Sequence, residues 1–287
     1  MNRRLSIFLL FAILCAAAAS LGCPSASDQT AAGERRPAAD AKIEDTSEAP
    51  ESNPVKVAHV IVALCDNEHQ GIVPVSAALG NGLDPDRNLY WGAAYGVRTF
   101  FRKSSEWQEV ESKGDQKSDI LERVVFRHQG DGTLLVADAY RGDRIRAALV
   151  DYLASVSGSL RSGVDVEGTK IGIYGGADLV AFVGHNGLMD FKIEEAFPAK
   201  DDKQRDAIIL ACASKPYFRD KLRDAGANPL LWTTNLMAPE AYILHDALEA
   251  WIGNGSDTDV RARAAAAYSK YQKISLRTAT DLLVTGE

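Results

Sequence analysis

Two apolar runs in the chain end in residues with reactive side chains. The run 179–183 is followed by His185, and the run 207–211 is followed by Cys212. Short, continuous apolar runs bounded by turn residues are typical of strands buried on both faces, as in a parallel sheet. Ligands bind outside the carboxyl ends of such strands, so we expect both side chains at one edge of a sheet. A thiol beside an imidazole is a nucleophile with its base.

The residues around these two positions resemble a known family. Val183–Gly187 resembles the strand and Gly-His-Gly signature of caspase-like cysteine peptidases, and Ile209–Ser214 resembles their strand-plus-Cys signature, most closely in the CHAT and separase branch. The stretches 221–227 and 229–232 resemble the helix and strand that follow the cysteine there. Two features depart from the family: Asn186 replaces the usual Gly, and Cys212 follows His185 by only 27 residues. The resemblance implies a caspase-like α/β fold, a three-layer α-β-α sandwich with a mostly parallel sheet.

In such a peptidase the two residues form a catalytic dyad. His185 acts as general base and acid, and Cys212 is the nucleophile that becomes acylated. The backbone N–H groups of Cys212, Asn186 and Gly187 are candidates for stabilising the oxyanion, worth about 3 kcal/mol per donor.

Asp66 and Asn67 follow the first expected strand, 57–64. In a caspase-like strand order that strand is adjacent to the strand that ends before His185. The resemblance then places both side chains near the dyad, where they orient His185 or form a pocket wall. The alternative is a solvated turn at a strand end.

The remaining cysteines leave a second interpretation open. Outside the N-terminal region only Cys65 and Cys212 remain, and an oxidising compartment allows these two to pair. A disulfide or an inert buried Cys212 favours an inactive caspase-like, or other α/β, binding or scaffold domain.

The N-terminus indicates export. A short basic start and the apolar run 5–19 are typical of a bacterial signal peptide over residues 1–22. Ser20-Leu21-Gly22-Cys23 resembles a lipoprotein cleavage box, which implies lipidation of Cys23 and attachment to a bacterial membrane at the cell envelope. The alternative is a soluble periplasmic or secreted protein. Residues 23–54 have almost no large apolar side chain and predict a disordered tether, so the folded domain spans 55–287.

Alternating patterns predict the elements of that domain. We expect strands near 57–64, 124–126, 134–136, 179–183, 207–211 and 230–234, and helices near 88–103, 143–156, 217–225, 239–252 and 257–273. Strands alternating with helices indicate an α/β sandwich.

Composition and motifs narrow the function classes. A net charge of −7 gives no support to nucleic-acid binding. We expect no cofactor, because neither a P-loop nor a dinucleotide fingerprint is present. We expect no metal either, because the calcium-like stretch 84–95 lacks the required Gly and Glu. The leading hypothesis is an exported, lipid-anchored cysteine peptidase acting on peptide or protein substrates. The sequence does not indicate an oligomeric state.

Overall fold

The computed structural model describes residues 49–114 and 116–286, so the predicted signal peptide, Cys23 and most of the predicted tether lie outside the described residues. An eight-stranded sheet runs in the order β11-β10-β9-β8-β1-β5-β4-β2. Its five central strands, from β10 to β5, are parallel, whereas β4, β2 and β11 are antiparallel to their neighbours. The predicted adjacency of the first strand to the strand before His185 is therefore confirmed.

The large sheet is built from strands β1 (Val57–Ala63), β2 (Trp107–Val110), β4 (Ile120–His128), β5 (Leu134–Tyr140), β8 (Leu179–Val183), β9 (Asp206–Leu210), β10 (Asn228–Thr233) and β11 (Leu283–Val284). A small antiparallel sheet contains β3 (Ser112–Lys113), β6 (Arg161–Val166) and β7 (Thr169–Tyr174). Strands β1, β5 and β8 are buried along their whole length, as expected for central parallel strands.

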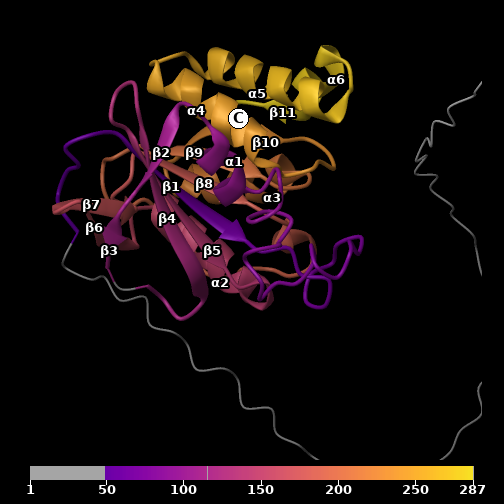
Figure 1. The fold of residues 1–287 in the computed structure, drawn as a ribbon, viewed down its shortest axis with the longest axis horizontal. Coiled ribbons are helices and arrows are strands. Elements are labelled where there is room, and N and C mark those ends of the chain that lie inside the picture. Colours follow the sequence, from indigo (N-terminus) through magenta and orange to yellow (C-terminus); the bar gives the residue numbers. More distant parts are fainter. Residues whose placement is uncertain (1–48, 115, 287) are drawn as a thin grey trace, which may run out of the picture. The chain divides into compact units, whose positions relative to one another are not determined.

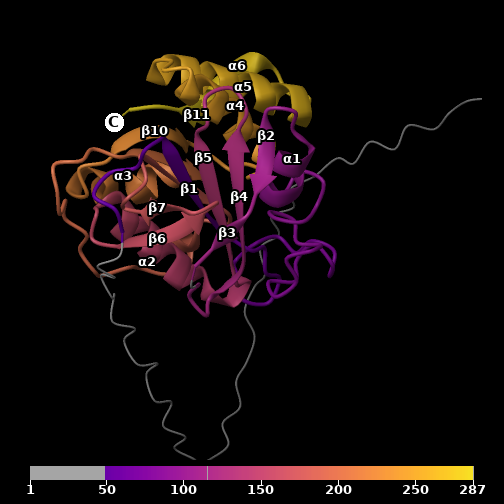
Figure 2. The same ribbon diagram turned by 60° about the vertical axis from the view of Figure 1, so that its left-hand side comes forward.

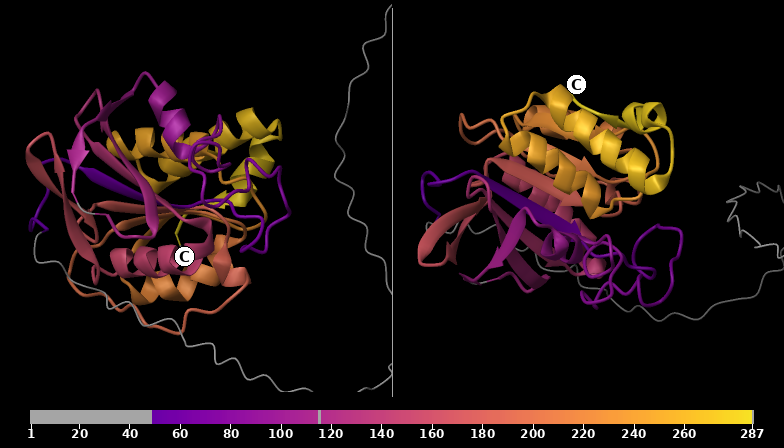
Figure 3. Two further views of the ribbon diagram at one scale, coloured as in Figure 1. Left: turned by 60° about the horizontal axis from the view of Figure 1, so that its bottom comes forward. Right: turned by 45° about the horizontal axis from the view of Figure 1, so that its top comes forward.

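Helices cover both faces of the sheet (Figures 1 and 3). The helices are α1 (Val97–Lys103), α2 (Ile145–Val156), α3 (Ser214–Asp224), α4 (Ala241–Ile252), α5 (Asp257–Gln272) and α6 (Leu276–Leu282). The apolar cores show the layers: α1, α4, α5 and α6 pack on one face, and α2, α3 and the β6–β7 hairpin pack on the other. Figure 2 shows the small sheet beside α2. The predicted three-layer sandwich with a mostly parallel sheet is confirmed.

One predicted helix is largely wrong. Of the expected span 88–103, only Val97–Lys103 is helical, and residues 88–96 form successive turns. The Asn88 side chain bonds to both the N–H and the C=O of Cys65 instead of capping a helix. At Gly92 and Gly96 a Cβ atom would approach neighbouring backbone atoms to 2.1 and 2.4 Å, so these tight turns require glycine at both positions.

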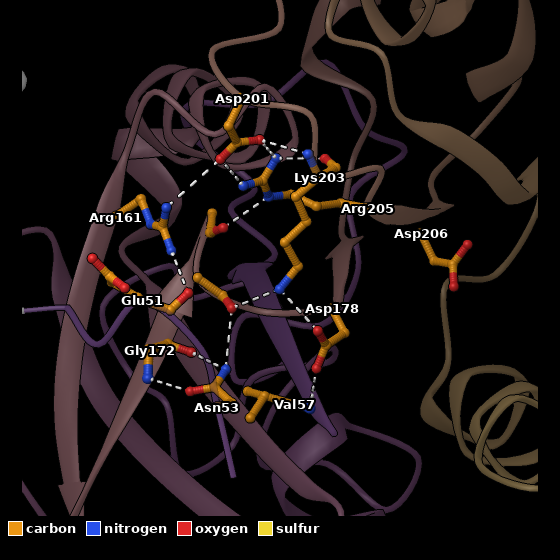
Figure 4. Close-up of polar contacts among 12 residues, drawn as sticks. Glu51, Asn53, Val57, Arg161, Gly172, Asp178, Asp201, Lys203, Arg205 and Asp206 are labelled. Atoms are coloured by element: carbon orange, nitrogen blue, oxygen red, sulfur yellow. Dashed lines mark hydrogen bonds and ion pairs between the residues drawn. The ribbon is translucent and has the colours of Figure 1, made fainter. Parts of the chain in front are cut away.

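The amino-terminal edge of the sheet is held by polar contacts (Figure 4). The Asn53 side chain bonds to the backbone of Gly172, and Asp178 accepts from Val57 N and from Lys203. Asn53 precedes the predicted start of the domain at Val55 and packs against it. A hollow of about 600 Å³ opens at this edge between Asp178 and Trp251.

A buried charged cluster lies between β1, β5 and β4. Asp138 receives a two-pronged hydrogen bond from Arg123 (2.6 and 2.8 Å) and one from His59 Nε2 (3.0 Å). Since Tyr174 N donates to His59 Nδ1 (3.1 Å), the ring is the neutral Nε2–H tautomer. Complete burial lowers the pKa of His59. Burial alone would raise the pKa of Asp138, but the Arg123 charge holds it well below its usual range.

Within residues 49–114 and 116–286, no helix combines the length and the apolar character needed to span a membrane.

Candidate functional site

His185 and Cys212 occupy matching positions at the carboxyl edge of the sheet. Strands β8 and β9 are parallel neighbours in which Val183 pairs with Leu210. His185 and Cys212 each follow that pair by two residues, so the backbone brings the two positions to adjacent strand ends. The sequence pattern predicted this juxtaposition, because both apolar runs end where the chain leaves the sheet.

A glycine brings the His185 loop close to β1. Gly184 has φ 154°, and its N–H donates to Leu210 O (3.2 Å). A Cβ atom here would lie 2.9 Å from the carbonyl oxygen of Ala63. Only glycine therefore allows the chain to cross so close to β1 and then present His185.

Cys212 lies on a sharp turn between a strand and a helix. Strand β9 ends at Leu210, and α3 begins at Ser214. Between them Ala213 adopts the left-handed conformation (φ 46°, ψ 41°), which is strained for a residue with a Cβ atom. Strain of this kind is typical of sites where the surrounding structure fixes a residue for function, as in nucleophile elbows.

Hydrogen bonds to β10 hold this turn in place. Thr233 Oγ1 donates to Ala211 O, and Thr233 Oγ1 and Ser214 Oγ lie 3.1 Å apart. Ala213 N donates to Asn235 O (2.8 Å). The bonds before and after Cys212 fix its backbone, and within residues 49–114 and 116–286 its own N–H has no acceptor.

The Cys212 thiol contacts the loop that follows β10. Its sulfur lies 3.4 Å from Met237 N and 3.5 Å from Met237 O. Among the described residues no hydrogen bond joins the sulfur to His185. Contacts between catalytic groups are often long in a protein without bound substrate.

His185 is oriented by a carboxylate that the sequence interpretation did not assign to it. His185 Nε2 lies 2.7 Å from Asp190 Oδ2, and the imidazole is only 7% exposed. The same oxygen accepts from Gly71 N (2.9 Å). A carboxylate that accepts from Nε2–H leaves Nδ1 as the basic nitrogen. Asp190 comes within reach because a short 3₁₀ turn, Gly187–Met189, follows His185. No periodic pattern reveals such a turn.

Two of the three predicted oxyanion donors are available. In the described part of the chain neither Asn186 N–H nor Cys212 N–H has an intramolecular acceptor. Gly187 N–H donates to His185 O (3.1 Å), so it is already engaged.

The Asn186 side chain ties the two reactive loops together. It is fully buried; its Nδ2 donates to Cys212 O (2.8 Å), and its Oδ1 accepts from Leu188 N (3.2 Å). The residue that departs from the family pattern therefore fixes the spacing between the His185 and Cys212 loops.

Asp66 and Asn67 shape the long loop between β1 and α1. Asp66 is 4% exposed and accepts from the N–H groups of Glu68 and His69. Asn67 forms a reciprocal pair of bonds with the backbone of Val75. Within residues 49–114 and 116–286 neither side chain bonds to His185, whose partner is Asp190. An orienting or pocket role for Asp66 and Asn67 stays a prediction.

Both cysteines of the described domain are free. Cys65 follows β1 and Cys212 follows β9, with β8 between them. Strands β1 and β9 are two strand spacings apart, so the Cα atoms of Cys65 and Cys212 are separated by about 10 Å. A disulfide joins Cα atoms that are less than about 7 Å apart. The possibility of a Cys65–Cys212 bridge is thus disfavoured. Burial raises the pKa of the Cys65 thiol to about 11.

Exposed apolar side chains occur in the segments that follow the strands at the carboxyl edge. Met189 (43% exposed) ends the 3₁₀ turn after His185, Tyr217 (41%) lies in the first turn of α3, and Val73 (75%) and Leu236 (68%) lie in the segments after β1 and β10. Solvent-exposed apolar groups gathered around a site are typical of surfaces that contact another chain.

The site contains no obvious metal centre. Among the described residues no three His, Cys, Asp or Glu side chains are grouped as metal ligands. The hollow at the opposite edge is separate from this site, and its side chains Lys56, Asp178 and Asp206 already have partners. No protein-family model, curated protein or solved structure matches the chain.

Proposed function

We propose that the chain is a caspase-like cysteine peptidase that hydrolyses peptide bonds through Cys212 and His185. The supporting observation is the placement of these residues at matching positions of adjacent parallel strands, with Cys212 on a strained turn. Asp190 beside His185 and two unused amide N–H groups supply the other parts that acyl transfer requires.

The proposed reaction follows from these groups. Asp190 holds the Nε2–H of His185, and Nδ1 accepts the proton of the Cys212 thiol. The thiolate then attacks the peptide carbonyl, and the amides of Cys212 and Asn186 stabilise the oxyanion. His185 returns the proton to the leaving amine. Water, activated by the same imidazole, hydrolyses the thioester and releases the acid and the free thiol.

Alkylation of Cys212 near neutral pH tests the dyad. Iodoacetamide should modify Cys212 faster in the wild type than in His185→Ala, because the imidazole promotes the thiolate. A peptide acyloxymethyl ketone should label the wild type at Cys212 but neither His185→Ala nor Cys212→Ala. Equal alkylation rates in wild type and His185→Ala, in folded proteins, would refute the dyad.

A second function is an inactive scaffold domain with the same fold. It is favoured by the Cys212 sulfur, whose hydrogen bonds among the described residues are to the backbone of Met237. This alternative requires that Cys212 react only after denaturation and that no peptide be cleaved.

We further propose export and lipid attachment through Cys23, on the strength of the basic start, the apolar run and Ser20-Leu21-Gly22-Cys23. Cys23→Ser should move the protein from the membrane fraction to the soluble fraction of expressing bacteria. Unchanged membrane association would contradict the anchor and favour another mode of attachment.

A further inference from the structure

A carboxylate lies in the chain segment that contacts the candidate nucleophile. Glu240 immediately precedes α4, three residues after Met237, whose backbone contacts the Cys212 sulfur. The chain turns back here, since Glu240 N donates to Ala238 O (2.9 Å). Residues 237–240 therefore connect the thiol contact directly to this carboxylate.

Glu240 is held in place by two hydrogen bonds to one oxygen of its carboxylate. One carboxylate oxygen, Oε2, accepts from Tyr242 OH (2.7 Å) and from Gln272 Nε2 (3.0 Å). Among the described residues no Lys, Arg or His nitrogen lies within 4.0 Å of this carboxylate, and no donor bonds to Oε1. A partly buried carboxylate with one open oxygen is suited to bind a cation.

Besides burial, the charges of Cys212 and Glu240 both raise the pKa values of two tyrosines, Tyr268 and Tyr90. Tyr268 OH accepts from Ala238 N (3.1 Å), the residue next to Met237. Burial raises the pKa of Tyr268, the Ala238 amide opposes this rise, and the charges of Cys212 and Glu240 add to it. Burial likewise raises the pKa of Tyr90 well above its ordinary value, and the charges of Cys65, Cys212 and Glu240 act in the same direction.

Aromatic rings form a wall next to Glu240. Tyr242 and Tyr271 are stacked with ring centroids 4.1 Å apart, and Tyr95, which is 44% exposed, contacts both edge to face. Lys270 Nζ already lies 5.3 Å from the Tyr271 ring centroid, so this cluster accepts a cation. Tyr242 is fully buried and Tyr95 is the ring of this group most open to a ligand, and a carboxylate near an exposed tyrosine ring is suited to lysine or arginine side chains.

We propose that Glu240 determines specificity by binding a lysine or arginine side chain of the peptide next to the bond attacked by Cys212. This inference rests on the proposed peptidase function. A cation bound here would also neutralise the negative carboxylate of Glu240, which by like-charge repulsion disfavours the Cys212 thiolate.

Charged thiol reagents test the charge near Cys212 without requiring peptidase activity. We would compare a trimethylammonium-bearing and a sulfonate-bearing methanethiosulfonate, in each of which the thiolate displaces methanesulfinate and forms a mixed disulfide. Peptide mass spectrometry of the full chain would follow Cys212 alone. Glu240→Gln, which keeps the acceptor for Tyr242, should lower the cation-to-anion rate ratio at least about fivefold, because it removes a negative charge that attracts one reagent and repels the other.

The matched control is Glu111→Gln. Glu111 is 73% exposed and paired with Lys113, in the segment between β2 and β3. Its replacement should leave the ratio unchanged. An unchanged ratio in Glu240→Gln, with unaltered circular dichroism, would overturn the inference.

Matched peptides separate this inference from the peptidase proposal. Peptides carrying arginine or neutral, isosteric citrulline before the scissile bond should differ at least tenfold in kcat/KM with the wild type, and far less with Glu240→Gln. Cleavage without preference would refute the role of Glu240 while sustaining the peptidase. If no peptide is cleaved but the reagent ratio depends on Glu240, the peptidase proposal and the substrate role both fail, and only a cation site remains.

Discussion

Asn186→Ala tests whether one buried side chain sets the spacing of the two reactive loops. The substitution removes the bonds to Cys212 O (2.8 Å) and Leu188 N (3.2 Å) from a residue that is 0% exposed. A buried polar group left without a partner costs about 1–3 kcal/mol. The bond to Leu188 is long, so its loss should cost about 1 kcal/mol, and the loss of the bond to Cys212 should cost about 1–3 kcal/mol. We therefore expect the free energy of unfolding to fall by about 2–4 kcal/mol in total.

Urea denaturation followed by tryptophan fluorescence measures this loss, with an unchanged m value as the sign of two-state unfolding. Alkylation of Cys212 should change in the same variant, since its carbonyl is no longer held. Asn228→Ala is the control: it removes one bond, to Asp206 (2.7 Å), at the opposite edge of the sheet. It should cost about 1 kcal/mol and leave alkylation unaltered. A loss below about 0.5 kcal/mol for Asn186→Ala, with normal alkylation, would show that the bridge is not required.

Three further outcomes are expected. Asp190→Asn should reduce peptide cleavage by about 100-fold or more with little change in melting temperature, because it disturbs the orientation and tautomer of His185 at a partly exposed position; normal cleavage would show that Asp190 is dispensable. Gly184→Ala should cost about 1–3 kcal/mol, measured by urea denaturation, because its Cβ meets Ala63 O at 2.9 Å. The lowered pKa of His59 means that below its ordinary value of 6.5 the unfolded chain binds a proton that the folded chain does not. Stability should therefore fall on acidification from about pH 6.5, by up to about 1.4 kcal/mol per pH unit, and His59→Gln should lack this dependence.

The sequence could predict the central strands and the edge where they end. Buried parallel strands leave continuous apolar runs, and the positions of His185 and Cys212 relative to those runs were readable without a structure. The α/β sandwich followed from the alternation of strands and helices, and its three layers were implied by the resemblance to caspase-like peptidases.

The contacts that complete the site could not be predicted in this way. Asp190 reaches His185 through a 3₁₀ turn, and Gly71 approaches Asp190 from a loop more than 100 residues earlier. The stretch 88–96 shows helical spacing, yet Asn88 bonds to Cys65 across 23 residues and the turns follow. Such outcomes depend on tertiary hydrogen bonds that local periodicity does not encode. The sequence pattern did not predict the pair α6 and β11. A strand of two residues, such as β11, is too short to leave a periodic pattern.

The position of the Cys212 sulfur is where the peptidase and scaffold proposals differ physically. The sulfur contacts Met237 on the β10 side of β9, whereas His185 lies on the β8 side. The backbone on both sides of the thiol is held by the bonds of Asn186 and Ala213, so a turn toward His185 would be made by rotation about the Cα–Cβ bond of Cys212. A thiol is a weak donor and acceptor, so breaking the Met237 contacts costs about 1 kcal/mol. Binding of a substrate carbonyl at the free amides of Cys212 and Asn186 can offset a cost of that size. The present thiol position is therefore compatible with catalysis, and the alkylation rate of Cys212 with and without His185 decides whether the turn occurs.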